Sequence, residues 1–286
     1  MNPVTIKRYL NTRDFLDDLE PKLLKEEAIN QLILRNAYRL RDPKITIDHF
    51  CGSLLRNKDV ALIFLFMAPY NLLVYDIVDL NHEEMTVFAQ FVHSHPLPVP
   101  GINASSRFAI SFLKIYQSLY PIAYQIRLTM DVMVLKQLNP ISVPKGTFRL
   151  ATLSDLPRVN DWAMCFQKEA VHQDADLHEM DQANQKRIQD QRLYVFENDE
   201  GQMVSMGQYS GIYPNGVSLS LIYTDLNKRN QGYGLAVTYH LSKQALDQGY
   251  QYVTLFVDQK NPISNRVYEK IGFVIVRDQY DIKFSQ

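Results

Sequence analysis

The chain has 286 residues, which is enough for two domains of ordinary size, and a formal net charge of -1. Its composition, 46% hydrophobic and 21% charged, is typical of packed cores and excludes a disordered chain. The balanced charge predicts no nucleic-acid partner. Met1–Leu10 lacks the apolar core of a signal peptide, and the most apolar run, Val60–Met67, is too short to span a bilayer. We therefore expect no membrane association, a cytoplasmic location and two reduced cysteines, Cys51 and Cys165.

Apolar periodicity in the first half predicts alternating helices and strands. Pro21 suits the first turn of a helix, and the prolines near residues 97–102 confine a strand there to an edge or an irregular position. We expect helices over Arg13–Leu19, Pro21–Leu40, Glu83–His93 and Ser105–Tyr120, and strands over Val60–Met67, Leu72–Val78, Leu97–Ile102 and Tyr124–Leu135. The first two of these strands, Val60–Met67 and Leu72–Val78, flank a short turn and predict a β-hairpin.

The segment Asn139–Gly146 holds two prolines and a glycine and predicts a linker, so we place domains at residues 1–140 and 141–286. The pattern then restarts. We expect strands over Phe148–Ala151, Leu193–Phe196, Met203–Tyr209, Val217–Thr224, Tyr252–Val257 and Phe273–Phe284, and helices over Ser154–Ala170, Leu177–Gln191, Gly232–Gln248 and Ser264–Ile271.

A strand, a polar turn and a glycine-containing helix start follow one another over Leu221–Gly234. The first turn of a helix leaves backbone N–H groups unpaired, and these favour an anion. Gly232 and Gly234 allow close approach to the backbone, and Arg229 adds a positive charge. The pattern is neither a P-loop nor a dinucleotide fingerprint. It indicates a pyrophosphate site, and the alternative is a plain strand–turn–helix junction.

A second polar segment, Asn261–Phe273, follows the next predicted strand and opens the next helix. Asn261 and Asn265 can cap that helix or bond a ligand. Tyr268 lies one turn after Ser264, and its hydroxyl is a candidate proton donor to a leaving group. The alternative is that Tyr268 is a residue at the edge of the core.

The two segments resemble a known family. Arg229-Asn-Gln-Gly232-Tyr-Gly234 is similar to the Arg/Gln-x-x-Gly-x-Gly/Ala motif of the GNAT superfamily of acyl-CoA-dependent N-acyltransferases. Asn261–Phe273 resembles the closing helix motif of that family, and the resemblance covers about Thr147–Phe284. It implies an α/β fold of two GNAT-like halves, each a mixed twisted sheet flanked by helices, with the CoA site in the C-terminal half.

The resemblance also implies roles for single residues. Tyr268 would protonate the departing thiolate after direct attack of an amine on the thioester. Ile222 and Thr224 would pair with the pantetheine arm as an added strand does, and Asn261 and Asn265 would bond the same arm. The pyrophosphate would be held by main-chain amides of consecutive residues, namely Arg229, Asn230, Gln231, Gly232, Tyr233, Gly234 and Leu235.

One departure from the family concerns the base. Many relatives carry an acid on the strand that leads to the phosphate loop, but Val217–Thr224 contains none, and Asp225 lies just past it. A water chain, or one of Glu169, His172 and Asp174, remains as the base.

The first half repeats the order of elements weakly, which suggests a tandem duplication with a degenerate first copy. The equivalent of the phosphate loop, Asp79–Glu84, has three acids and no glycine or Arg. Acids repel a pyrophosphate, so we expect no CoA there and a structural or substrate-shaping role.

We expect an N-acetyltransferase that uses acetyl-CoA as co-substrate and a primary amine of a small molecule or a peptide as acceptor. The alternatives are transfer of a different acyl group and a CoA-binding sensor or scaffold without turnover; the neutral charge disfavours a transferase that uses charged tRNA. We expect no metal, because no further ligand accompanies His93 and His95.

Overall fold

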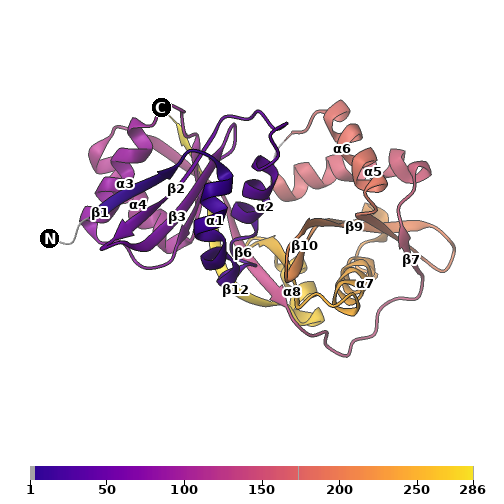
Figure 1. The fold of residues 1–286 in the computed structure, drawn as a ribbon. Helices are drawn as coiled ribbons and strands as arrows, with labels where there is room; N and C mark the ends of the chain where they lie inside the picture. The colour runs from indigo at the N-terminus through magenta and orange to yellow at the C-terminus, as the bar shows by residue number, and fades with distance from the viewer. Residues whose placement is uncertain (1–3, 173, 286) are drawn as a thin grey trace. The chain divides into compact units, whose positions relative to one another are not determined.

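A computed structural model describes residues 4–172 and 174–285, and these form an α/β protein (Figure 1). The chain divides into two compact units: Met1–Asp131 with Arg277–Gln286, and Val132–Val276. The predicted fold class, mixed sheets flanked by helices, is confirmed.

The N-terminal unit orders its strands β1-β2-β3-β4-β5-β12. Neighbours are antiparallel except for β4 and β5, which run parallel over only two residue pairs. The elements in chain order are β1 (Val4–Tyr9), α1 (Thr12–Leu23), α2 (Gln31–Leu40), β2 (His49–Arg56), β3 (Asp59–Met67), β4 (Leu72–Asp76), α3 (His82–Ser94), β5 (Gly101–Ala104), α4 (Ser106–Leu119), β6 (Ala123–Leu135) and β12 (Val274–Ser285). The predicted hairpin of β3 and β4 is confirmed.

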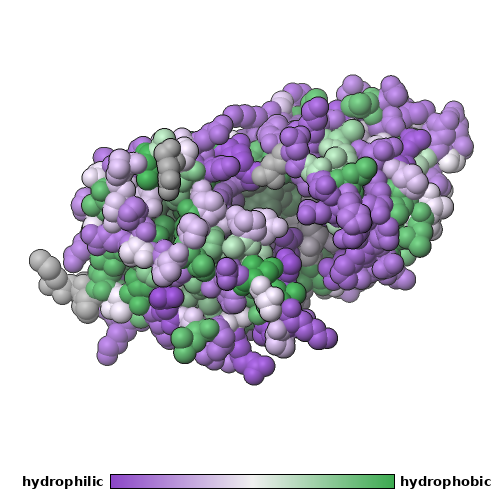
Figure 2. Space-filling view, turned by 90° about the horizontal axis from the view of Figure 1, so that it is seen from above, coloured by the Kyte–Doolittle hydropathy of each residue, from purple (hydrophilic) through white to green (hydrophobic). Residues whose placement is uncertain are grey.

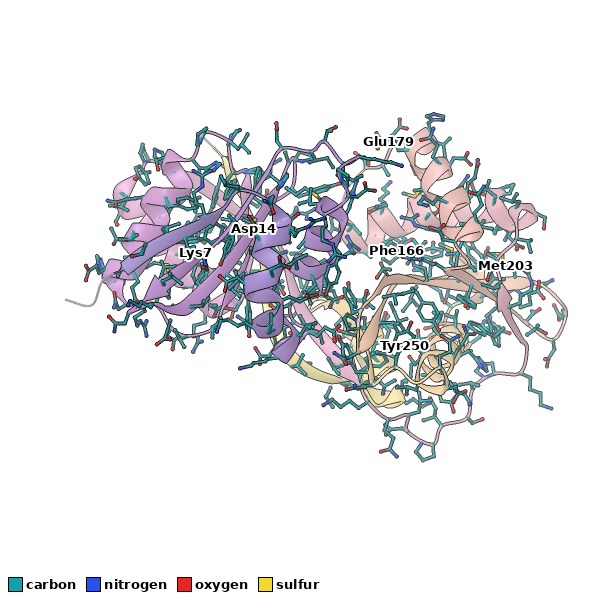
Figure 3. The ribbon with its side chains drawn as sticks, in the orientation of Figure 1. Lys7, Asp14, Phe166, Glu179, Met203 and Tyr250 are labelled. Carbon is teal, nitrogen blue, oxygen red and sulfur yellow. The ribbon has the colours of Figure 1, made fainter. Side chains whose placement is uncertain are left out.

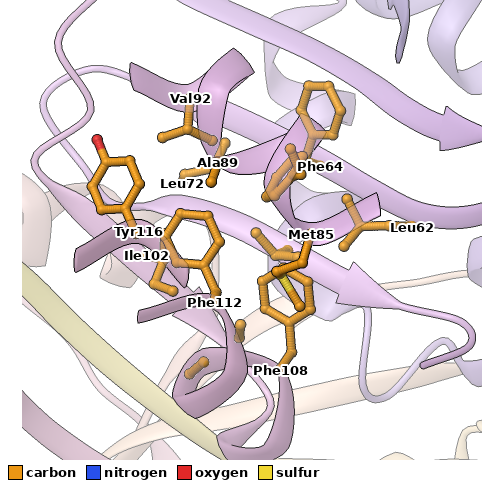
Figure 4. Close-up of a cluster of buried hydrophobic side chains, with 14 of the residues drawn as sticks. Leu62, Phe64, Leu72, Met85, Ala89, Val92, Ile102, Phe108, Phe112 and Tyr116 are labelled. Atoms are coloured by element: carbon orange, nitrogen blue, oxygen red, sulfur yellow. The ribbon is translucent and has the colours of Figure 1, made fainter. Parts of the chain in front are cut away.

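The core of this unit is aromatic. Alternate residues of β3, Leu62 and Phe64, are fully buried against α3 and α4, which contribute Phe88 and Phe112 (Figure 4). Ring pairs such as Phe88 with Phe112, whose centroids lie 5.9 Å apart, pack edge to face. The periodicity predicted for these helices therefore places their apolar side on the sheet.

Three expectations for this unit were wrong. The helix predicted over Pro21–Leu40 is broken: α1 includes Pro21 in its last turn, and the buried Asn30 donates its Nδ2 to the carbonyl of Leu23 at 2.9 Å. Strand β5 is internal, because the prolines precede Gly101–Ala104 rather than interrupt it. Strands β1 and β2 were not predicted; β1 is short, and none of its residues is fully buried.

The C-terminal unit orders its strands β6-β11-β10-β9-β8-β7, and β6 contributes its last residues from Val132. The remaining elements in chain order are β7 (Thr147–Leu150), α5 (Leu156–Phe166), a π-turn (Gln167–Val171), α6 (Leu177–Gln189), β8 (Leu193–Glu197), β9 (Met203–Ile212), β10 (Gly216–Thr224), α7 (Tyr233–Asp247), β11 (Tyr252–Asp258) and α8 (Pro262–Ile271). Each predicted strand and helix of this half is present to within a few residues at its ends.

Two apolar clusters fill this unit. One joins α7 and α8 to the sheet and includes Leu241 and Ile271. The other packs α5 and α6 around the buried Trp162. Phe166, Met203 and Tyr250 are partly buried against these clusters (Figure 3).

The unit boundaries differ from the predicted division at 140/141. Strand β6 runs through the boundary without a break, and its last part buries Met133 and Leu135 in the core of the C-terminal unit. Strand β12 leaves that unit, and its residues from Arg277 onward belong to the N-terminal one, where Tyr280 pairs with Ala104 of β5. The Pro-rich segment Asn139–Gly146 is thus a loop inside the C-terminal unit.

The surface mixes polar and apolar side chains. In the view of Figure 2 hydrophilic residues predominate on the side where the polar helix α6 lies, and Glu179 of that helix is exposed. Among the described residues, no helix is both long and apolar enough to cross a bilayer.

Candidate active site

The sheet of the C-terminal unit opens between β10 and β11. Within the described residues, their parallel pairing runs from Gly216 to Ser218 and stops there. Farther along β10 the ladder with β9 shifts between Ser220 and Tyr223, and Leu221 has a φ of 55°. A bulge of this kind bends a strand and leaves backbone groups unpaired. The predicted contacts of the pantetheine arm, Ile222 and Thr224, lie on this open part of β10.

Helix α7 begins beside the end of β10 with an uncapped first turn. Its N-cap is Gly232, which has a φ of 83° and no side chain to accept a bond from the first amides. A Cβ on Gly232 would lie 3.0 Å from Pro144 Cγ, and a Cβ on Gly234 would lie 3.1 Å from Thr224 Oγ1. The two glycines therefore allow β10, the loop and α7 to pack closely. The positive end of the dipole of α7 lies at this turn, whose backbone amides have no side-chain cap.

The other predicted phosphate-binding residues lie in the same turn. Asn230, with a φ of 62°, and Gln231 are exposed before Gly232. Tyr233 is half-buried, and its carbonyl accepts a bond from Ser205 Oγ at 3.1 Å, while Leu235 is buried in the core. The turn is therefore anchored on one side and open on the other.

Arg229 is already engaged in this structure. Its Nη2 donates to Glu169 Oε2 at 2.7 Å, and its Nε donates to the carbonyl of Thr224 at 3.3 Å. Its guanidinium lies 5.2 Å from the ring centre of Tyr223, whose hydroxyl donates to Glu169 Oε1 at 3.2 Å. Partial burial opposes the charge of Arg229, but the bond to Glu169 raises its pKa overall. The guanidinium thus stays cationic next to the first turn of α7.

Helix α8 contains the other predicted residues. Asn261 is its N-cap and accepts the amide of Ser264 at 3.1 Å. Asn265 donates its Nδ2 to the carbonyls of Asp258 and Asn261, and its buried Oδ1 has no hydrogen-bond partner among the described residues. Buried polar atoms are seldom left unpaired, so this oxygen is suited to a donor on a bound molecule.

Tyr268 is buried on the inner side of α8, 8% exposed and packed against Phe273. Burial raises its pKa to about 12, although a hydrogen bond with Ser264 opposes the shift. The hydroxyl therefore stays protonated at neutral pH, as a proton donor must.

The acids near the loop are held by contacts with neighbouring residues. Asp225 accepts the amide of Asn227 at 2.9 Å and lies 3.4 Å from an Nη of Arg158, so it holds the loop. The π-turn brings Glu169 to Tyr223 of β10. His172 follows this turn, and its Nε2 lies 3.6 Å from Asp258 Oδ2. Asp258 was not identified from the sequence; the signal that could have found it is an acid directly at the end of β11.

The histidines of the N-terminal unit are packed as aromatic residues. His95 stacks on Phe50 and His93 on Tyr120, with ring centres 3.7 Å and 3.5 Å apart. No group of three or more His, Cys, Asp or Glu side chains in residues 4–172 and 174–285 is arranged to hold a metal.

Comparison with known proteins gives a family for the C-terminal unit. Residues 156–273 match the model of the acetyltransferase (GNAT) family, while comparison with curated proteins gives no significant match.

Several solved structures share the fold over the whole chain. A GCN5-related N-acetyltransferase from Sphaerobacter thermophilus is 13% identical with a TM-score of 0.65, covering 100% of this chain and 96% of that one. A Drosophila protein is 12% identical with a TM-score of 0.66, covering 100% and 99%. A GNAT-family acetyltransferase from Colwellia psychrerythraea is 15% identical with a TM-score of 0.56, covering 98% of each chain. At these identities the likeness shows the fold alone. The family match alone identifies residues 156–273 of this chain as an acetyltransferase domain of the GNAT family.

Proposed function

We propose that the chain transfers an acetyl group from acetyl-CoA to a primary amine of a small molecule or a peptide. The observation that carries the proposal is the uncapped first turn of α7, with Gly232 at its N-cap and Arg229 beside it, at the open end of β10. Amides and a cation at one helix start suit a pyrophosphate, and an open strand edge suits an extended amide arm.

Each predicted residue has a part in this proposal. The amides of residues 229–235 hold the pyrophosphate, and Arg229 exchanges Glu169 for it. Ile222 and Thr224 pair with the pantetheine arm through their main chain, while Asn261 and Asn265 bond the same arm from α8. These contacts hold the thioester carbonyl at the opening, where an amine can reach it.

The reaction needs one bond formed and one broken. The amine nitrogen attacks the carbonyl carbon, the carbon–sulfur bond breaks, and Tyr268 gives its proton to the sulfur as it leaves. A backbone N–H near Thr224 stabilises the negative charge that develops on the carbonyl oxygen. The N-terminal unit has a structural or substrate-shaping part.

A thiol-release assay with acetyl-CoA and a panel of amines, including polyamines, amino acids and peptides, tests the proposal. We expect thiol release that depends on one class of amine, with propionyl-CoA and longer acyl-CoA run in parallel to compare acyl groups. Saturable CoA binding without amine-dependent thiol release by any amine would contradict the proposal and favour a CoA-binding sensor.

A further inference from the structure

The π-turn Gln167–Val171 reaches both strands that border the opening. Toward β10, Glu169 accepts bonds from Tyr223 and Arg229. Toward β11, the residue that ends the turn, His172, forms an ion-pair contact with Asp258 at 3.6 Å. His172 has a left-handed backbone, with φ 55° and ψ 40°, which is uncommon for a residue other than glycine. Such strain and such turns are concentrated at functional sites.

Asp258 is held by hydrogen bonds, whereas the side chain of His172 is accessible to solvent. Its Oδ1 accepts the amide of Lys260 at 2.9 Å, its carbonyl accepts Asn265 Nδ2, and its side chain is only 16% exposed. The remaining oxygen, Oδ2, faces His172 Nε2. The imidazole itself is 53% exposed, so its other nitrogen is open to solvent or to a ligand. A carboxylate this close to one ring nitrogen favours an imidazole orientation in which the other nitrogen faces away from it.

We infer that His172 accepts the proton that the acceptor amine loses, and that Asp258 positions the imidazole for this step. The inference rests on the proposed function and deepens it. When the amine nitrogen bonds to the carbonyl carbon, one N–H proton passes to His172 Nδ1, and the exposed imidazolium then releases it to solvent. Tyr268, which protonates the sulfur, regains its proton from solvent, so the net products are an amide and a free thiol.

The neighbouring acids are less suited to the step. Oε1 of Glu169 accepts the hydroxyl of Tyr223, and Oε2 accepts Arg229 until the pyrophosphate takes its place. Asp174 is exposed. A carboxylate is ordinarily a weaker base than an imidazole, and a proton acceptor works best when its basicity suits the working pH. Within the described residues, the charged group that contacts the imidazole is Asp258 from the end of β11, and the helical turn that precedes His172 also carries Lys168 and Glu169.

The test compares the pH dependence of kcat at saturating amine in the unaltered chain, His172→Gln, Asp258→Asn and, as a matched acid outside the pair, Asp174→Asn. We expect His172→Gln to lose about 10²–10⁴-fold in kcat together with the acidic limb of the profile. Asp258→Asn should move that limb to lower pH, because removing a carboxylate lowers the pKa of the adjacent imidazole. Asp174→Asn should leave rate and profile unchanged.

Two further readouts separate a chemical role from a structural one. Calorimetric titration with CoA should give the same affinity for all four proteins, and NMR titration of the His172 ring should show the lower pKa in Asp258→Asn. If His172→Gln keeps both the rate and the acidic limb while the unaltered chain turns over, this inference is wrong and the proposed function stands. Absence of turnover by the unaltered chain with every amine would overturn both.

Discussion

Each unit contains one helix whose N-terminus can be compared with that of the other, and the two begin in opposite ways. In each, a helix follows the strand that makes the short parallel pairing: α3 after β4 and α7 after β10. In the N-terminal unit the first turn of α3 is closed by its own side chains, since Asn81 Oδ1 accepts the amide of Glu84 at 3.0 Å and Glu84 Oε2 accepts the amide of Asn81 at 2.8 Å. In the C-terminal unit the N-cap of α7 is Gly232, which closes nothing.

Charge reinforces the contrast. The buried Glu84 is bonded by Arg56 at 2.5 Å, and this bond holds the pKa of Glu84 below its ordinary value. The first turn of α3 therefore holds its own carboxylate, which is paired with Arg56, whereas the first turn of α7 has no acid of its own and Arg229 beside it pairs with Glu169 from another segment. The two helix starts thus differ in a few cap residues: α3 closes its own first turn, and the first turn of α7 has no side-chain cap.

The largest expected effect comes from closing the open turn. Gly232→Glu places a carboxylate where the pyrophosphate would bind, and CoA affinity should fall below detection in a calorimetric titration. Gly201→Glu is the matched control: Gly201 also has a positive φ, 73°, but a Cβ there meets nothing within 4 Å. The control should bind CoA like the unaltered chain, and equal affinities for both variants would exclude α7 as the site.

Removing the proposed acid should affect turnover rather than binding. Tyr268→Phe should lower kcat of thiol release by about 10²–10⁴-fold and leave CoA affinity nearly unchanged. Tyr209→Phe removes another buried hydroxyl of the same unit, one that donates to the carbonyl of Leu241 at 2.8 Å, and should keep the rate. Normal turnover by Tyr268→Phe would remove this tyrosine from the mechanism.

A smaller effect is expected in the N-terminal unit. Glu84→Gln keeps a side chain that can cap α3 but leaves Arg56 without its charged partner, so the free energy of unfolding should fall by about 1–3 kcal/mol at pH 7. Because folding lowers the pKa of Glu84, its contribution is present above the ordinary glutamate pKa of about 4.3 and is lost as pH falls through the lower folded value.

Chemical denaturation of Glu84→Gln and the unaltered chain at pH 7 and at pH 3 measures this difference. The gap between the two proteins should narrow at the lower pH, and CoA affinity should not change at pH 7. A gap that is independent of pH would show that the charge of Glu84 does not stabilise the unit.

The sequence predicted the features that depend on local order. Gly232, Gly234 and Arg229 could be identified because a glycine-containing turn between a strand and a helix has a local physical meaning. The pairing of His172 with Asp258 could not, since it joins residues far apart in the chain and depends on a π-turn that no periodicity indicates. The lone acid after β11 was visible but had no motif around it.

The unit boundaries also could not be predicted from local sequence patterns. The prolines of Asn139–Gly146 correctly indicated a loop, but β6 passes through the boundary as one uninterrupted strand, and β12 returns to the N-terminal unit. Neither feature changes composition or periodicity at the point where the chain changes units. A division of the chain at residue 141 would therefore remove Met133 and Leu135 from the core that they complete.

The central claim, one open helix start and one closed, is tested most directly by the number of CoA molecules that the unaltered chain binds. Calorimetric titration of the full-length protein with CoA should give one saturable site per chain, and the same titration of Gly232→Glu should give none. Two sites per chain, or one site that persists in Gly232→Glu, would contradict the account, because the first turn of α3 would then bind CoA despite its own cap.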